Sequence, residues 1–397
     1  MNGNQLADAR ILHLFANYKW TGPADPAIRA AARLRGLGLD VVFAQGSFVH
    51  PGGEHRVAEE LARLGLPVVV GLELRKHFHV PSLLRDVRAL RRLVVRDRYA
   101  LLHCHQPADH LIAALAVRRL PQPPVIVRSL YEPEPPRAGW RERAAMRRTA
   151  AVLAPTGPAK AGVVQRFRLP PERVLLQEPV TEPRVLVGDS SRARFGAQPG
   201  DLLVGITARI QPHRRFDLLW DTARAVVDRM PNVRFVLLGR GNEEDTRTLV
   251  TEPIARLRLQ ANVVLPGYQK GPAYEAALRA LDAFLFLVPG SDGTCRAVCD
   301  AMAFGLPVVC TRRGILPELV ADRRAGEVPG FAVEETPAAL SAALLRLLGD
   351  PVLRAAIGRA AARRAQLDMD PLRAAQRTAA LYAELLAPAA AVPRSRR

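Results

Sequence analysis

Short apolar runs of strand length alternate with longer amphipathic runs along most of the chain, and this pattern is typical of parallel α/β sheets. In the first half the predicted strands are Ile11–Ala16, Val41–Ala44, Val68–Val70, Leu101–Cys104, Val125–Val127 and Val152–Ala154. The clearest helical patterns between them are Ala24–Leu37, Pro81–Arg98 and Asp109–Arg119. The first half is therefore predicted to form one doubly wound sheet.

A second series of the same kind follows a polar stretch rich in proline and glycine. Its predicted strands are Leu202–Thr207, Arg234–Leu238, Val263–Pro266, Phe284–Val288 and Val308–Thr311. The predicted helices lie near Phe216–Arg229, Glu244–Leu259, Pro272–Ala280 and Cys295–Phe304. Two Rossmann-like domains facing an interdomain cleft would place a ligand at the carboxyl ends of the strands.

We assign the domains from these changes in pattern. Residues 1–180 are the N-terminal Rossmann-like domain, 181–200 the linker and 201–370 the C-terminal Rossmann-like domain. The helical segment 371–387 is expected to pack back on the N-terminal domain, and 388–397 to be a disordered tail.

Composition narrows the class of protein. The chain has 397 residues and is 49% hydrophobic, enough for two full cores. No apolar run is long enough to cross a bilayer, and the N-terminus lacks the pattern of a signal peptide. The four cysteines have no zinc-binding spacing. We therefore expect a cytoplasmic protein with reduced thiols.

The net charge of +19 has two explanations at this point. Only four of the 57 basic residues are lysines, which suits the coding bias of a GC-rich genome. The other explanation is a surface that meets anions, with anionic lipid ahead of nucleic acid, for which no motif is present. The basic amphipathic segment Pro81–Arg98 fits either packing on the sheet or contact with the inner face of a membrane.

The stretch PGSDGTCRAVCDAMAFGLPVVC, residues 289–310, carries the strongest functional signal. It is predicted to run from a strand through a loop into a helix and a further strand. Free backbone N–H groups at the helix start attract phosphate. Asp292 lies just before that helix and Asp300 lies two turns along it. An anion cradle with two carboxylates suits a sugar nucleotide.

This stretch resembles the glycosyltransferase 4 family of the GT-B superfamily, whose pattern has two glutamates separated by seven residues and then G-x-P-V-V. Here both acids are Asp, and Gly305-Leu306-Pro307-Val308-Val309 matches the end of the pattern. The resemblance implies that Arg209, Arg214 and Asp292 act in catalysis. It also implies a set of donor-binding residues: Gly239, Gly241, Gly293, Thr294, Cys295 and Asp300. Gly22 is the remaining match to the family's diphosphate and acceptor loop.

The resemblance implies a retaining, metal-independent hexosyltransferase that uses a UDP- or GDP-linked sugar as substrate and needs no cofactor. The acceptor would be a glycan or a lipid-linked glycan of the cell envelope. Many family members have a His after the strand that corresponds to Val125–Val127, but here the chain reads Arg128-Ser129-Leu130. This departure keeps open a degenerate protein that binds a sugar nucleotide or a partner without turnover.

His103 and His105 lie at the end of a predicted strand. Packing and hydrogen bonding are the expected roles, because no third metal ligand is near them in the sequence.

Overall fold

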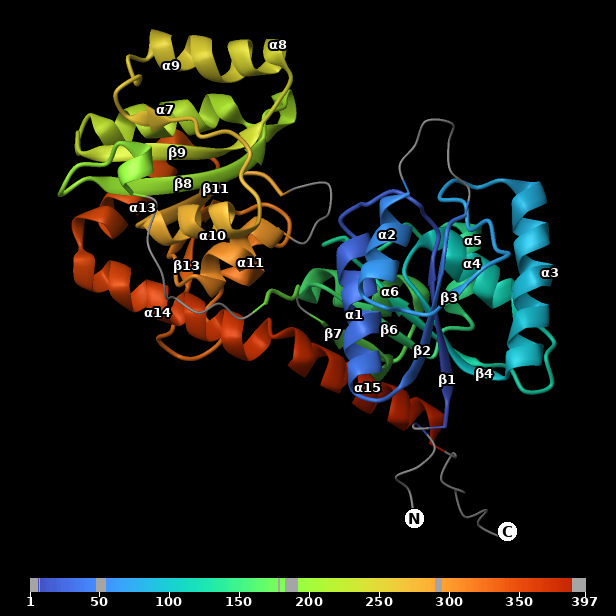
Figure 1. Ribbon diagram of the computed structural model, residues 1–397. Coiled ribbons are helices and arrows are strands. Elements are labelled where there is room, and N and C mark those ends of the chain that lie inside the picture. Colours follow the sequence, from blue (N-terminus) through green and yellow to red (C-terminus); the bar gives the residue numbers. More distant parts are fainter. Residues whose placement is uncertain are drawn as a thin grey trace. The chain divides into compact units, whose positions relative to one another are not determined.

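The computed structural model describes residues 6, 8–47, 55–177, 179–182, 192–289 and 295–387. The chain forms two compact units, the first built from residues up to 178 together with those from 371 onward, and the second from 179–370. Each unit is a parallel sheet with helices on both faces (Figure 1). The predicted doubly wound α/β architecture is confirmed.

The first unit has a seven-stranded sheet in the order β3-β2-β1-β4-β5-β6-β7. Its strands are β1 (Arg10–Phe15), β2 (Asp40–Gln45), β3 (Val68–Val69), β4 (Tyr99–Cys104), β5 (Val125–Ser129), β6 (Ala151–Ala154) and β7 (Val174–Leu176). Alternate residues of β1 enter the two cores: Ile11 and Phe15 face one side, and Leu12 and Leu14 face the other. This alternation explains why an almost wholly apolar strand is stable between two helical layers.

Most helices of the first unit contribute to one of those two cores. The helices are α1 (Ala24–Gly36), α2 (Arg56–Arg63), α3 (Val80–Asp97), α4 (Pro107–Ala116), α5 (Trp140–Met146), α6 (Gly157–Phe167) and α15 (Pro371–Leu386). Helices α1, α2 and α15 contribute to one core, and α3, α4 and α5 to the other. In α3 the buried Leu90, Leu93 and Val94 show that this basic helix packs on the sheet.

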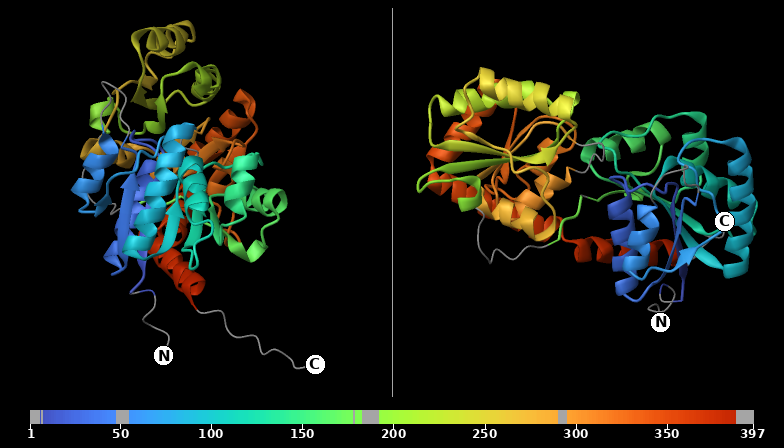
Figure 2. Two further views of the ribbon diagram at one scale, coloured as in Figure 1. Left: turned by 90° about the vertical axis from the view of Figure 1, so that its right-hand side faces the viewer. Right: turned by 45° about the horizontal axis from the view of Figure 1, so that its top comes forward.

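The second unit has a six-stranded sheet in the order β10-β9-β8-β11-β12-β13. Its strands are β8 (Leu202–Arg209), β9 (Val233–Arg240), β10 (Val263–Val264), β11 (Ala283–Phe286), β12 (Val308–Thr311) and β13 (Gly330–Val333). The strands lie between helices on both faces, as the right-hand view of Figure 2 shows. Helices α7, α9 and α13 cover one face, and α10, α11 and α12 the other.

The bounds of these helices are α7 (Phe216–Val227), α8 (Glu243–Thr246), α9 (Glu252–Arg256), α10 (Gly271–Ala280), α11 (Arg296–Ala303), α12 (Leu316–Leu319), α13 (Pro337–Gly349) and α14 (Pro351–Asp368). The helix predicted near Glu244–Leu259 is present as a continuous helical run, in which a π-helical turn, Arg247–Thr251, joins α8 to α9. Pro253 in the first turn of α9 has no N–H to continue a regular α-helical ladder.

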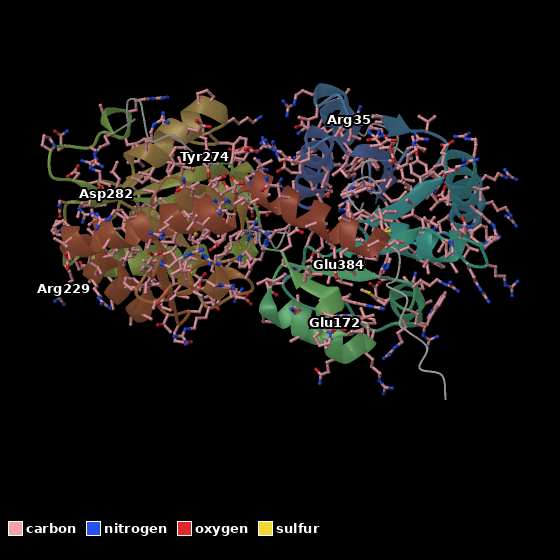
Figure 3. All side chains as sticks on the ribbon, turned by 90° about the horizontal axis from the view of Figure 1, so that it is seen from below. Arg35, Glu172, Arg229, Tyr274, Asp282 and Glu384 are labelled. Carbon is pink, nitrogen blue, oxygen red and sulfur yellow. The ribbon has the colours of Figure 1, made fainter. Side chains whose placement is uncertain are left out.

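Among the described residues, no helix combines the length and the apolar character that crossing a membrane requires. Side chains with blue nitrogen ends are spread over both units, in keeping with the net charge of +19 (Figure 3). Residues 183–191 of the predicted linker and the predicted tail, 388–397, lie outside the described residues.

Candidate functional site

A pocket of about 190 Å³ lies in the second unit at the carboxyl ends of β8, β9 and β11. The first turn of α11 completes it. Its lining is Thr207, Ala208, Arg209, Arg214, Leu238, Gly239, Arg240, Tyr268, Phe286, Cys295, Arg296 and Ala297. Four of these residues are arginines, and none of the described lining residues is acidic. The pocket is therefore suited to an anion.

Two adjacent arginines after β8 have different surroundings. Arg214 lines the pocket, and its Nη1 donates to the carbonyls of Val288 at 3.0 Å and Pro289 at 3.1 Å. Arg215 instead pairs with Asp217 at 3.0 Å and Glu335 at 3.4 Å. Of these two arginines, only Arg214 is among the residues that line the pocket.

Arg209 and three residues that sequence reasoning missed, Arg240, Tyr268 and Arg296, also line the pocket. Arg209 is exposed at the end of β8 and is the register partner of Arg240 on β9. The guanidinium of Arg240 lies 4.8 Å from the centroid of the Tyr268 ring, which is 51% exposed. Arg296 belongs to the first turn of α11. Arg240 lies between Gly239 and Gly241, the two glycines predicted to bind the donor, and this Gly-Arg-Gly string was the sequence signal for it.

The two glycines of that string are explained by close packing. A Cβ on Gly239 would lie 2.0 Å from the carbonyl oxygen of Ala208. A Cβ on Gly241 would lie 2.7 Å from Cβ of Ile210. Gly239 lines the pocket, whereas Gly241 is not among its lining residues. Both glycines allow the ends of β8 and β9 to approach, so packing alone accounts for them.

Asp300, which was predicted to bind the donor, lies on α11 but is not among the residues that line the pocket. Oδ1 of Asp300 accepts a hydrogen bond of 2.9 Å from Thr181 Oγ1. Burial, and secondarily the charge of Asp300, raises the pKa of Tyr274, so these two side chains are neighbours. Cys295 is buried before α11 with a left-handed φ of 49°. Cys295 also lines the pocket.

Three predicted residues of the donor loop, Asp292, Gly293 and Thr294, lie outside the described residues. Gly22 lies in the turn between β1 and α1, in the first unit. The structure therefore brings together Arg209, Arg214, Gly239 and Cys295 of the predicted set.

The histidines of the first unit form a buried cluster with a third member. His13 is the register partner of His103 across β1 and β4, and ring nitrogens of His13, His103 and His105 lie within 4.8 Å of one another. The expectation that no third potential metal ligand lies nearby is wrong, because the sheet pairs residues 90 positions apart in sequence.

Hydrogen bonds account for all six ring nitrogens of this cluster. His13 Nδ1 and His105 Nε2 are 2.9 Å apart. His105 Nδ1 contacts Tyr131 Oη at 2.6 Å, and His103 Nε2 contacts Ser129 Oγ at 2.8 Å. Tyr382 Oη of α15 lies 2.5 Å from His103 Nδ1 and 3.3 Å from His13 Nε2. The network is satisfied without a metal ligand role, which supports the predicted role in packing and hydrogen bonding.

The position of the family's histidine is occupied differently at the end of β5. Arg128 is 4% exposed, and its Nε and Nη1 have no hydrogen-bond partner among the described residues. Nη1 lies 3.8 Å from Asp109, which accepts from the backbone N–H groups of Ala16 and His105. Burial raises the pKa of Asp109 to about 7 despite these partners. This end of the sheet therefore holds a buried cation.

Two family models match most of the chain. The model described as Glycosyltransferase Family 4 matches residues 17–176, and the model described as Glycosyl transferases group 1 matches residues 201–350. The first match spans six of the strands of the first unit, and the second contains the arginine-lined pocket.

Curated relatives match over shorter lengths. D-inositol 3-phosphate glycosyltransferase from Segniliparus rotundus is 31% identical over 211 residues, which cover 51% of this chain and 45% of the relative. The enzyme of the same name from Kribbella flavida is 30% identical over 298 residues, which cover 69% of this chain and 64% of the relative. GDP-mannose-dependent alpha-mannosyltransferase from Mycolicibacterium smegmatis is 30% identical over 41% of this chain and 39% of its own length. The chain thus spans less than two thirds of each of these relatives.

Solved structures agree with the fold over nearly the whole chain. HepE from Anabaena in complex with UDP has a TM-score of 0.74 at 19% identity, covering 94% of this chain and 100% of that one. A glycosyltransferase from Rickettsia africae has a TM-score of 0.76 at 13% identity, covering 96% and 100%.

Proposed function

The chain belongs to glycosyltransferase family 4, and from that premise we propose that it transfers a sugar from a nucleotide-sugar donor to an acceptor hydroxyl. The observation that carries this proposal is the pocket with four arginines beside the start of α11. A nucleoside diphosphate is the part of the donor that such a site would hold, because guanidinium groups and helix N–H groups both bind phosphate.

The same charges would act in the reaction itself. As the bond between the anomeric carbon and the diphosphate breaks, negative charge grows on the leaving phosphate, and Arg209 and Arg214 would stabilise it. The acceptor oxygen would bond to the anomeric carbon on the same face and pass its proton to the leaving phosphate. Because attack and departure occur on the same face, the reaction retains the configuration of the anomeric carbon. Arginines supply the positive charge that a divalent cation would otherwise supply, which supports a metal-independent transfer.

The donor is proposed to be a hexose linked to UDP or GDP. Tyr268 and Arg240 offer an exposed aromatic ring and a planar cation at the edge of the pocket, and either surface can stack on a nucleobase. HepE binds UDP, and the Mycolicibacterium smegmatis relative is named for GDP-mannose. These two precedents support screening both nucleotides first.

The acceptor is proposed to be a glycan or lipid-linked glycan of the cell envelope, reached from the inner face of the membrane. A hollow of about 350 Å³ in the first unit supports this, because its lining includes Lys76, Arg137 and Arg141 with exposed Phe78 and Trp140. The guanidinium of Arg141 lies 4.3 Å from the Phe78 ring centroid. Aromatic and basic side chains together suit an acceptor with an anionic and an apolar part.

The test is a donor screen on the purified chain. UDP- and GDP-sugars would be incubated with the protein, and release of UDP or GDP would be followed with and without acceptor preparations. We expect slow donor hydrolysis with one nucleotide and faster release when the acceptor is present. The Arg209→Ala variant should lose this activity. Turnover that is unchanged in that variant would contradict the assigned role of the pocket.

A second candidate is a protein that binds a sugar nucleotide without turnover. The observations that favour it are that Asp300, an expected donor-binding residue, is bonded to Thr181, and that the buried Arg128 lies where many family members have a histidine. Saturable UDP binding by calorimetry, combined with no release from any donor over a broad acceptor panel, would select this candidate.

A further inference from the structure

A larger pocket, of about 560 Å³, lies in the second unit at the opposite edge of the same sheet. It is formed where β11 and β12 begin, whereas the arginine-lined donor pocket lies where β8, β9 and β11 end. Its walls are the end of α10, the turn between α11 and β12, and the first half of α14. A volume in this range is typical of small-molecule sites.

Close packing of α14 forms this pocket. A Cβ on Gly358 would lie 2.4 Å from the carbonyl oxygen of Gly305, so the helix can reach the α11–β12 turn only because this residue is glycine. Leu281, Leu306 and Pro307 provide an apolar lining. The N-terminus of α14 is already capped, since the Asp350 side chain accepts from the N–H groups of Val352 and Leu353 at 2.9 Å.

Three arginines line the pocket and have no acidic partner among the described residues: Arg279, Arg354 and Arg359. The Nε of Arg279 is buried and has no hydrogen-bond partner in the described part of the chain. Its guanidinium lies 6.0 Å from the centroid of the Phe304 ring. Arg354 donates through Nη1 to the carbonyl of Leu348 at 2.8 Å, and that neutral contact leaves its charge uncompensated.

Asp282 is the acidic residue in this lining, and other groups already use it. Its Oδ2 accepts from Arg192 Nη1 at 3.0 Å and from the N–H of Leu203 at 2.8 Å. The Asp282 carboxylate is therefore neutralised by Arg192, which is not one of the three pocket arginines. The pocket keeps a positive charge that an anionic ligand would compensate.

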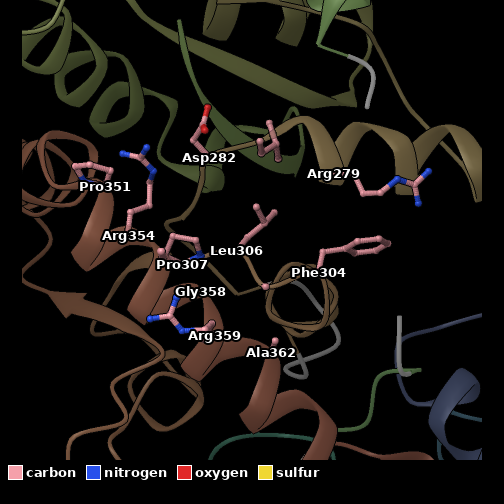
Figure 4. A pocket seen from close by; sticks show the side chains of 13 residues that line it. Arg279, Asp282, Phe304, Leu306, Pro307, Pro351, Arg354, Gly358, Arg359 and Ala362 are labelled. Carbon is pink, nitrogen blue, oxygen red and sulfur yellow. The ribbon is translucent and has the colours of Figure 1, made fainter. Parts of the chain in front are cut away.

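The arginines are separated along the pocket. Figure 4 shows Arg354 and Arg359 on the α14 side and Arg279 beside Phe304 on the other, with Leu306 between them. Each end of the pocket therefore offers a cation to an anionic group. We propose that this pocket binds a small molecule with two separated anionic groups and a ring or apolar middle, such as a sugar bisphosphate, at a site distinct from the donor pocket.

Calorimetric titration of fructose 1,6-bisphosphate into the full chain, with UDP present to occupy the donor pocket, tests this proposal. We expect one-to-one binding that weakens about tenfold in each of Arg279→Met and Arg354→Met, because each variant loses a charge-assisted contact. Fructose 6-phosphate should bind more weakly than the bisphosphate by a similar factor. The same titration in an Arg209→Ala/Arg214→Ala background keeps the result independent of whether UDP binds.

Arg363→Gln is the matched control. Arg363 lies one turn beyond Arg359 on α14, pairs with Glu327 at 3.5 Å and does not line the pocket. Its removal lowers the net charge equally, so binding should be unchanged. An equal loss in this control, or no binding to the wild-type chain, would overturn the proposal. Arg359→Gln changes an exposed side chain, so it tests the site even if the other variants unfold.

Discussion

Adjacent arginines at the end of β8 should respond differently to substitution. Arg214 lines the pocket of the second unit that we propose binds the donor, whereas Arg215 is paired with Asp217 and Glu335. We expect Arg214→Ala to weaken UDP binding by roughly 10- to 100-fold, the usual value of a lost charge-assisted hydrogen bond. Calorimetry with UDP measures this directly.

Arg215→Ala is the natural comparison, because it removes the same charge one residue away. It should leave UDP affinity within about twofold, since a partly exposed ion pair contributes little. Equal effects of the two substitutions would mean that overall charge, and not the position of Arg214, determines binding.

Gly239 gives a prediction about stability. Its added Cβ would lie 2.0 Å from the Ala208 carbonyl oxygen, so backbone must move. We expect Gly239→Ala to lower the free energy of unfolding by about 1–3 kcal/mol or more, the usual cost of overpacking. Chemical denaturation measures the change. Gly36→Ala is the control, because a Cβ there meets no atom within 4 Å, and a stability equal to wild type is expected.

At the residue scale, the sequence could predict the pocket only in part. Arg209, Arg214, Gly239 and Cys295 follow strand or helix boundaries that periodicity reveals. Arg240, Tyr268 and Arg296 were missed, because their convergence depends on β9, β8 and β11 being neighbours. Strand order is set by long-range packing, and a local pattern does not contain it.

At the scale of elements, the hydroxyl of Tyr382 joins α15 to the first sheet by hydrogen bonds, in addition to the apolar packing of this helix. Tyr382 Oη contacts both His103 and His13 in a fully buried setting. Tyr382→Phe keeps the ring and removes these hydrogen bonds, so we expect a loss of about 1–3 kcal/mol in the free energy of unfolding. Urea denaturation with a Tyr18→Phe control checks this. Similar losses in both variants would contradict an anchoring role.

The histidine cluster should also make stability depend on pH. Burial lowers the pKa of His13 to about 3 and holds the pKa values of His103 and His105 well below 6.5. The unfolded chain therefore binds protons below about pH 6.5 that the folded chain does not. Stability is present above that pH and falls as the pH is lowered toward 3.

Asp109 opposes this trend, because its pKa is raised to about 7 and the folded state holds its proton more tightly there. The stability lost through the three histidines exceeds the stability gained through one carboxylate, so the free energy of unfolding still falls as the pH is lowered. Urea denaturation at pH 7.5, 6.5 and 5.5 should show the decline. The exposed His77→Gln variant should show the same decline as wild type, and a flat profile in wild type would rule out the mechanism.

Element boundaries show where sequence patterns suffice. Long apolar strands such as β8 and β9 were predicted closely, because their burial on both faces gives continuous apolar runs. The three-residue β7 and the edge strand β13 were not predicted. Short edge strands leave too few residues to establish a period, and their pairing with β6 and β12 determines them.

For the whole molecule, the structure shows one of the two roles that the sequence allowed for the basic helix α3, packing on the sheet, and leaves its other face available for a membrane. Packing on the sheet accounts for the buried face of α3, while Arg85, Arg88 and Arg92 are exposed. We expect the chain to float with vesicles that contain anionic phospholipid and to be released at about 0.5 M salt, where charges are screened within a few ångströms.

Replacing Arg88 and Arg92 with Gln should weaken that association. Replacing two arginines of the second unit, Arg247 and Arg256, is the charge-matched control and should leave it largely intact. Equal effects of the two replacements would mean that net charge alone causes the association. If the wild-type chain does not float with the vesicles, the proposed membrane contact is wrong.

The order of assembly during synthesis follows from the place of α15. Ala375, Leu381 and Tyr382 complete a core whose other members come from the first half of the chain. During synthesis, this core of the first unit therefore stays open to solvent until α15 has emerged from the ribosome. The second unit is one uninterrupted segment and can mature earlier. A chain that terminates after residue 370 would therefore keep a complete second unit. Its first unit would lack α15 and expose apolar surface, and this would make it a target for chaperones and proteases.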